Sequence, residues 1–257
     1  MGENAKVLFD ELGEVALITL NRPGQRNAID AETCALLRDA TEEFERNDRF
    51  RIAVLRGSGA VFCAGMDLKA FSTGEAEDIL FGPGRLGGFV SRSRRKPVIA
   101  AVQGAALAGG FELMLACDMT IATRTAKFGL PESKRGLIAG AGGAFRIGQR
   151  VPPAIANEIL LTGDWFSGER AYGLGLVNRL VDEAPDAAAI ELAQAIARNA
   201  PLSLEASLEL SRCASTVHED ACWEANDRLL RVLVASKDAL EGARAFAEKR
   251  DPVWVAK

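Results

Sequence analysis

Two short runs of almost entirely apolar residues constrain the fold more than any other feature of this chain. Residues 52–55 (Ile-Ala-Val-Leu) and residues 97–102 (Pro-Val-Ile-Ala-Ala-Val) are rich in β-branched side chains and contain no charge. Strands that are covered on both faces have this pattern, and they are typical of parallel sheets flanked by helices. Helical patterns lie between and after the two runs. We therefore expect an α/β fold.

The N-terminal part predicts a hairpin followed by a helix. Residues 6–10 and 14–20 are β-rich runs that flank Leu12-Gly13, which indicates a β-hairpin. Asp30 stands where an N-cap is expected, before apolar side chains at helical spacing: Leu36, Leu37, Ala40 and Phe44. Residues 72–88 are rich in glycine and acids, and we expect them to form a mobile flap or a surface loop.

The C-terminal part of the chain lacks strand-like patterns. From Asp186 onward apolar residues recur at helical spacing, and Pro201 and Ser236 mark breaks between helices. We expect an α/β core over residues 1–185 and a helical section over residues 186–257 that belongs to the same functional unit. The apolar faces of these helices require a partner surface, which is either the core or a neighbouring subunit.

Composition argues against several classes of function. With 31 Lys and Arg against 35 Asp and Glu, the formal net charge is −4, so we expect neither nucleic acid nor a membrane as partner. The five cysteines form no C-x-x-C pair and His218 is the single histidine, so neither a metal site nor a Ser-His-Asp triad is expected. No nicotinamide or flavin cofactor is indicated. The first residues lack a secretory signal pattern, and we expect a cytoplasmic location.

Two glycine-bearing loops follow the two buried runs. Residues 62–68 (Phe-Cys-Ala-Gly-Met-Asp-Leu) come after the first, and residues 104–112 (Gly-Ala-Ala-Leu-Ala-Gly-Gly-Phe-Glu) come after the second and lead into a helix. Small residues let backbone N–H groups approach a ligand, and a helix N-terminus presents unpaired donors. Two such loops could direct one N–H each to a single oxygen atom, as an oxyanion hole does. Either loop alone is also typical of an ordinary turn.

The order of motifs along the chain resembles the crotonase superfamily, the enoyl-CoA hydratase and isomerase family. The matching segments run from the N-terminal loop to the tail: residues 21–23, 27–28, 64–68, 96–102, 108–112, 128–132, 140–143, 161–163 and 246–250. The resemblance implies an acyl-CoA substrate and a spiral of ββα units with a C-terminal helical trimerisation section. It also implies a homotrimer or a dimer of trimers.

The resemblance assigns site residues by motif position. The oxyanion donors would be the backbone N–H groups of Met66 and Gly109, and the two hydratase carboxylates fall on Glu112 and Glu132. Adding water to a 2-enoyl thioester needs a base for the water and an acid for the α-carbon. Two close carboxyl groups in a desolvated cleft tend to share a proton, so acid and base are available together. We expect Glu112 to activate the water and Glu132 to exchange the α-proton.

Coenzyme A, which is part of the substrate, needs local cations and a surface on which to lie. The resemblance places it along the loops of residues 21–28 and 64–68. The candidate contacts are Arg22, Arg26, Ala28, Ala64, Asp67, Leu68 and Lys69. Phe246 and Lys249 in the tail would reach the coenzyme A of a neighbouring subunit. Each basic residue is also consistent with a solvated surface charge.

The chain departs from the common hydratase pattern at three places. It has Ala108-Gly109-Gly110 where a glycine triplet is common, residues 136–139 (Gly-Leu-Ile-Ala) where Gly-Thr-Ile-Pro is frequent, and Ala144-Phe145 where Thr-Gln is frequent. These changes bear on the shape of the acyl pocket, which Phe145 could narrow or reroute.

Residues 151–158 and 249–254 are similar to the carnitinyl-CoA dehydratase branch, and residues 62–68 are also similar to steroid side-chain hydratases. A betaine, a steroid or an ordinary fatty acyl group therefore all remain open. The leading hypothesis is a hydro-lyase that adds water to a 2-enoyl-CoA. The alternatives are an enoyl-CoA isomerase, which needs no water, and a non-catalytic acyl-CoA-binding protein that has kept the fold.

Overall fold

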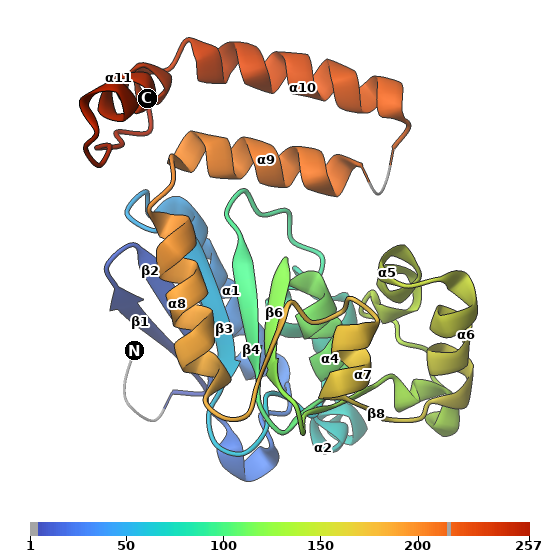
Figure 1. Ribbon diagram of the computed structural model, residues 1–257. Helices are drawn as coiled ribbons and strands as arrows, with labels where there is room; N and C mark the ends of the chain where they lie inside the picture. Colours follow the sequence, from blue (N-terminus) through green and yellow to red (C-terminus); the bar gives the residue numbers. More distant parts are fainter. Residues whose placement is uncertain (1–4, 215–216) are drawn as a thin grey trace.

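The chain folds around two β-sheets, as a computed structural model that describes residues 5–214 and 217–257 shows (Figure 1). In the larger sheet six strands follow the order β1-β2-β3-β4-β6-β9. Their bounds are β1 (Val7–Leu12), β2 (Val15–Leu20), β3 (Ile52–Gly57), β4 (Val98–Val102), β6 (Met119–Thr123) and β9 (Arg179–Val181). The smaller sheet has the order β5-β7-β8, with β5 (Ala105–Leu107), β7 (Lys127–Gly129) and β8 (Phe166–Ser167).

The two apolar runs form central strands of the larger sheet. β1 and β2 pair antiparallel as the expected hairpin, and from β2 to β9 every neighbouring pair is parallel. Every residue of β4 is buried, and in β3 only Arg56 is partly exposed. The absence of charge in these runs follows from helices that cover both faces of the sheet. The prediction of buried parallel strands is confirmed.

The chain alternates between the two sheets. β4 of the larger sheet is followed by β5 of the smaller one and then by a helix, and β6 is followed by β7 in the same way. An isolated bridge between Cys63 and Ala106 gives β3 a similar continuation. Each turn of the chain thus adds a strand to both sheets, which confirms the predicted α/β fold of the crotonase type. β5, β7 and β8 have two or three residues each, too short to leave a pattern in the sequence.

Helices surround the sheets. The α-helices are α1 (Ala31–Arg46), α2 (Leu68–Ala70), α3 (Ala76–Phe81), α4 (Gly109–Ala116), α5 (Gly143–Arg150), α6 (Pro153–Thr162), α7 (Gly168–Gly173), α8 (Pro185–Ala197), α9 (Pro201–Cys213), α10 (Glu219–Val234) and α11 (Lys237–Glu248). Short turns of other helix types are η1 (Pro23–Gln25), η2 (Phe71–Glu75), η3 (Leu86–Gly88) and η4 (Pro131–Arg135). Asp30 caps α1 as expected, because its carboxylate accepts the N–H of Thr33 at 2.8 Å.

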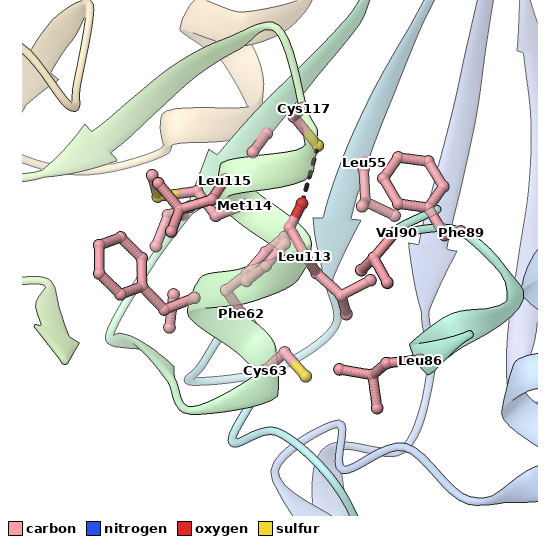
Figure 2. Close-up of a cluster of buried hydrophobic side chains, with 14 of the residues drawn as sticks. Leu55, Phe62, Cys63, Leu86, Phe89, Val90, Leu113, Met114, Leu115 and Cys117 are labelled. Atoms are coloured by element: carbon pink, nitrogen blue, oxygen red, sulfur yellow. Dashed lines mark hydrogen bonds between the residues drawn. The ribbon is translucent and has the colours of Figure 1, made fainter. Parts of the chain in front are cut away.

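α4 is the most deeply buried helix near the site. Seven of its eight residues are buried, and its side chains pack among those of Leu55, Phe62, Leu86 and Phe89 (Figure 2). Close packing requires glycine at the start of α4, since a Cβ at Gly110 would lie 2.1 Å from the carbonyl oxygen of Cys63. The first turn of α4 is therefore held against the loop after β3.

Residues 72–88 differ from the expected flap or loop. Most of them belong to the helical turns η2, α3 and η3. The side chain of Glu75 accepts the N–H of Ala31 at 3.0 Å, and Ile79 and Leu86 are buried. The glycines and acids that suggested a loop instead form turns between short helices, and two apolar anchors attach the segment to the core.

The C-terminal helices fall into two groups (Figure 1). α8 packs on the larger sheet, where Ala189, Ala193 and Ala197 are buried against its strands. α9 and α10 pack on each other farther from the sheet, and α10 has no buried residue. Within residues 5–214 and 217–257, no helix combines the length and the apolar character needed to cross a membrane.

Candidate active site

Two loops meet at one end of the parallel strands. The chain after β3 lies beside residues 26–29, because the N–H of Ala64 donates to the carbonyl of Arg26 at 3.0 Å and the N–H of Ile29 to the carbonyl of Gly65 at 2.9 Å. The same loop is tied to β5, since the N–H of Leu107 donates to the carbonyl of Cys63 at 3.1 Å. The segments that the motifs singled out are thus joined into one scaffold.

The two expected oxyanion donors lie close together. A Cβ placed on Gly109 would be 3.3 Å from the nitrogen of Met66, and one placed on Gly65 would be 2.9 Å from the nitrogen of Gly109. Gly65 has φ +96°, a conformation that favours glycine. Within the described part of the chain, neither the Met66 N–H nor the Gly109 N–H donates a hydrogen bond. Both donors are therefore available to a ligand.

The donors line a cavity of about 360 Å³. Both candidate carboxylates, Glu112 and Glu132, line the same cavity. The rest of its wall is mainly apolar, with two arginines: Ala64, Leu68, Leu80, Phe81, Arg85, Leu86, Ala108, Arg135, Leu137, Ile138, Gly140 and Ala141. The fold thus brings together two acids that stand twenty positions apart in the sequence.

Glu112 lies in the first turn of α4 and is only 3% exposed. Its Oε1 accepts the backbone N–H of Gly143 at 2.8 Å. Burial raises the pKa of Glu112 to about 7, the hydrogen bond from Gly143 opposes this rise, and the nearby carboxyl of Glu132 adds to it. A carboxyl group with this pKa can both accept and release a proton near neutral pH.

Glu132 follows Pro131 at the start of η4 and is partly buried. Its Oε2 is buried and has no hydrogen-bond partner among the described residues. Burial raises the pKa of Glu132, while its own backbone N–H and the charge of Arg135 oppose the rise. A buried carboxyl oxygen without a partner is costly in a folded protein, so this atom is a candidate contact for a substrate.

The predicted coenzyme A contacts divide into two groups. Ala64 and Leu68 line the cavity, whereas Arg22, Arg26, Ala28, Asp67 and Lys69 lie on the adjoining loops. Arg26 and Lys69 are exposed. Arg22 differs, because its guanidinium forms ion pairs with Asp30 at 3.1 Å and Asp67 at 3.0 Å and is mostly buried. Asp67 also caps α2 through the N–H groups of Lys69 and Ala70, so Arg22 and Asp67 hold the loop in shape.

Phe246 and Lys249 do not lie at this cavity in the same chain. They belong to the end of α11, on the opposite side of the molecule from α2 (Figure 1). The ring of Phe246 is 88% exposed. The expectation that these residues reach the site of a neighbouring subunit stays a prediction.

The effect expected of Phe145 is not seen. Its side chain is 60% exposed and does not line the cavity, because it projects from α5 beside the guanidinium of Arg146. The departure at residues 136–139 does reach the cavity, through Leu137 and Ile138. Sequence reasoning also missed Arg85 and Arg135, and the second of these stands three positions after Glu132, on the same side of η4.

No group of three or more His, Cys, Asp or Glu side chains in the described ranges is placed to hold a metal ion. The expectations of no metal and of no other cofactor remain predictions.

Comparison with known proteins defines the class. A profile described as enoyl-CoA hydratase/isomerase matches residues 10–257. The chain belongs to this family, the crotonase superfamily, and the resemblance drawn from the motifs is confirmed.

Particular relatives narrow the branch. The chain is 43% identical to a carnitinyl-CoA dehydratase of Salmonella heidelberg, over 94% of this chain and 95% of the relative. It is also similar to the crystal structure of an enoyl-CoA hydratase from Mycobacterium marinum, with a TM-score of 0.94, 43% identity and coverage of 98% and 100%. A carnitinyl-CoA hydratase structure from Mycobacterium avium gives a TM-score of 0.78 at 43% identity, with coverage of 98% and 99%. These relatives support the carnitinyl-CoA dehydratase-like branch and an enzyme of the enoyl-CoA hydratase type.

Proposed function

We propose that this enzyme reversibly adds water to the double bond of a 2-enoyl-CoA thioester. The observation that carries the proposal is the convergence of the buried carboxyl of Glu112 and the partly buried carboxyl of Glu132 with the unpaired N–H groups of Met66 and Gly109 on one cavity. Hydration of a conjugated thioester needs this set of groups: an acid, a base and donors for the oxygen on which negative charge collects.

In the proposed mechanism the thioester oxygen accepts hydrogen bonds from the backbone N–H groups of Met66 and Gly109. Glu112, with its pKa raised to about 7, takes a proton from water as the water oxygen bonds to the β-carbon. Negative charge moves to the thioester oxygen, where each donor contributes about 3 kcal/mol in a site that excludes water. Glu132 then delivers a proton to the α-carbon. In dehydration the two acids exchange roles.

The coenzyme A portion would lie along the joined loops of residues 26–29 and 64–69. Arg26 and Lys69 are the exposed cations on these loops, whereas Arg22 acts by fixing Asp67. We also propose that the helical section assembles the chain into a homotrimer or a dimer of trimers. Two observations support this: α10 has no buried residue, and α11, which carries the exposed Phe246, lies on the opposite side of the molecule from α2. The cytoplasmic location and the lack of nucleic-acid or membrane partners stay predictions.

The test follows the absorbance of crotonyl-CoA, which falls when the conjugated double bond is hydrated. Glu112→Gln and Glu132→Gln should each lower kcat by about 10²–10⁴-fold, since each removes an acid or base but keeps the shape of the side chain. Glu191→Gln is the matched control, because Glu191 is exposed on α8.

Three results would contradict the proposal. Wild-type rates in either cavity variant would remove that residue from the mechanism. Turnover of a 3-enoyl-CoA to the 2-enoyl isomer without hydration would indicate an isomerase. Tight binding of acyl-CoA with no turnover would indicate a non-catalytic binding protein. Thermal melting of each variant excludes misfolding.

A further inference from the structure

Arg85 and Arg135 stand out among the residues that line the active-site cavity. Both are exposed, and neither forms a salt bridge with any residue in 5–214 or 217–257. Most arginines around the core are engaged instead, as Arg94, Arg146 and Arg150 donate to backbone carbonyls. The cavity therefore presents two exposed guanidinium groups that form no salt bridge within the described residues.

The backbone at Arg85 adopts a strained conformation. Arg85 has φ 55° and ψ −149°, a conformation that strongly favours glycine. The turn is fixed on both sides, because the N–H of Arg85 donates to Gly82 at 2.8 Å and the carbonyl of Arg85 accepts from Gly88 at 2.7 Å. Gly84 and Gly87 beside it also have positive φ. In a glycine-rich turn, a long cationic side chain thus occupies a strained position, and strain of this kind concentrates at functional sites.

Arg135 is placed by η4. With about three residues per turn, this helix type puts Arg135 directly above Glu132 on the same side. The next residue, Gly136, turns the chain away with φ +70°, and the N–H of Leu137 donates to the carbonyl of Glu132 at 3.1 Å. Arg135 thus marks the side of the cavity where Glu132 would meet the α-carbon of the acyl group.

The remaining wall offers little to a positively charged acyl group. Quaternary ammonium ions are held by aromatic faces or by carboxylates. Among the described residues that line the cavity, Phe81 is the one aromatic residue, and it is 64% exposed. The two carboxyl groups of the lining, Glu112 and Glu132, are assigned above to proton transfer at the double bond. Guanidinium groups, by contrast, match carboxylates in charge and geometry.

We propose that the acyl group of the substrate carries a carboxylate, which Arg85 and Arg135 bind, and that the same arginines reject acyl groups carrying a quaternary ammonium. This inference rests on the proposed hydration of 2-enoyl-CoA thioesters. It separates this chain from relatives that are named for carnitinyl-CoA, since the carnitinyl group bears a quaternary ammonium.

The test compares three but-2-enoyl thioesters of coenzyme A that differ only at carbon 4: crotonyl-CoA carries hydrogen, glutaconyl-CoA a carboxylate and crotonobetainyl-CoA a trimethylammonium group. We expect the wild-type kcat/KM for glutaconyl-CoA to exceed that for crotonobetainyl-CoA by at least about 100-fold, since both the attraction and the rejection contribute. Arg85→Gln and Arg135→Gln should each reduce the ratio of glutaconyl-CoA to crotonyl-CoA kcat/KM by about tenfold or more.

The ratio is the readout because Arg135 also acts on Glu132, and a general loss of rate cancels in it. Lys134→Gln is the control, since Lys134 is an adjacent exposed cation that pairs with Asp164 and does not line the cavity. Arg85→Gly supplies a second readout: it should relieve the backbone strain and raise Tm while losing the carboxylate preference.

The outcomes are distinguishable. A preference for crotonobetainyl-CoA in the wild type, or an unchanged ratio in both arginine variants, overturns the inference while hydration itself stands. An equal loss for all three thioesters in the arginine variants would mean that the arginines bind the phosphates of coenzyme A, and it also overturns the inference. If the wild type hydrates none of the three, the proposed function fails instead.

Discussion

The helices α4 and α10 both carry many apolar side chains, but they differ in how much of that apolar surface is buried. α4 has eight residues and buries seven of them, whereas α10 has sixteen residues and buries none. Trp223, Val232 and Val234 of α10 are each at least 60% exposed. The comparison teaches that contacts within the chain hold the helix of the site in place, while α10 leaves apolar side chains exposed.

Deleting a large core side chain should give the largest effect on stability. Phe44 on α1 is fully buried, and Phe44→Ala should lower the free energy of unfolding by about 3–5 kcal/mol at every protein concentration. Val232→Ala on α10 should change it by less than about 0.5 kcal/mol in the dissociated chain. Urea denaturation at two protein concentrations checks both values. A large loss for Val232→Ala in the dissociated chain would contradict the comparison.

A proline substitution at the first residue of each helix should lower kcat in α4 but not in α10. Gly109 and Glu219 are the first residues of α4 and α10, a position whose backbone tolerates proline. At Gly109 the added ring also requires the side chain of Leu86 to move, since a Cβ there would lie 2.5 Å from its Cδ2. Gly109→Pro removes a proposed oxyanion donor, so kcat should fall by about 10²–10³-fold. Glu219→Pro should leave kcat unchanged. Equal activity in the two variants would remove the Gly109 N–H from the mechanism, provided that melting curves show both to be folded.

The pH dependence of the free energy of unfolding should reveal the raised pKa of Glu112. The unfolded chain loses the proton of this carboxyl near its ordinary pKa of 4.5, while the folded chain keeps it until about 7. Between these values the folded state binds more protons, so the stability falls as pH rises. The shift corresponds to roughly 3 kcal/mol at most. Glu112→Gln has no such proton and keeps the acceptor for Gly143, so its stability relative to wild type should increase from pH 5 to pH 8. A difference that is constant with pH would contradict this.

Thiol labelling, which perturbs the protein least, should distinguish the buried core from the outer helices. Cys34, Cys63 and Cys117 are buried in the core, and burial raises the pKa of the latter two to about 12. Cys213 and Cys222, on α9 and α10, are partly exposed, with their Sγ atoms 3.7 Å apart. A disulfide reagent should therefore titrate two thiols rapidly in the folded protein and all five in denaturant. More than two fast thiols would mean that the core opens readily.

The sequence predicted what local patterns can encode. The strands β3 and β4 could be predicted because short, continuous apolar runs are typical of strands covered on both faces of a sheet. The helix α1 could be predicted from its N-cap, Asp30, and from its apolar face. The smaller sheet was not visible, because strands of two or three residues are set by their partners. The helical turns of residues 72–88 could not be predicted for a similar reason, since their contacts with Ala31 and Cys34 join segments far apart in the sequence.

The site was predictable as a set of motif positions and not as a geometry. Spacing could not bring Glu112 and Glu132 together, because only the alternation between two sheets does so. The ion pairs of Arg22 could not be predicted, since its partners Asp30 and Asp67 are contributed by other segments. Arg85 left one usable trace, an arginine inside a glycine-rich turn.

The hydrogen bond between Glu112 and the N–H of Gly143 has an evolutionary consequence. α5 begins at Gly143 and receives no cap from the side chain of its own N-cap residue, so a residue of the reaction also anchors a helix start. A descendant that abandoned catalysis would still be selected to keep an acceptor at position 112. The buried Oε2 of Glu132 has no hydrogen-bond partner in residues 5–214 and 217–257, so position 132 does not anchor a second helix in this way. Among descendants of this chain, a glutamate at position 132 is therefore a better indicator of catalytic activity than a glutamate at position 112.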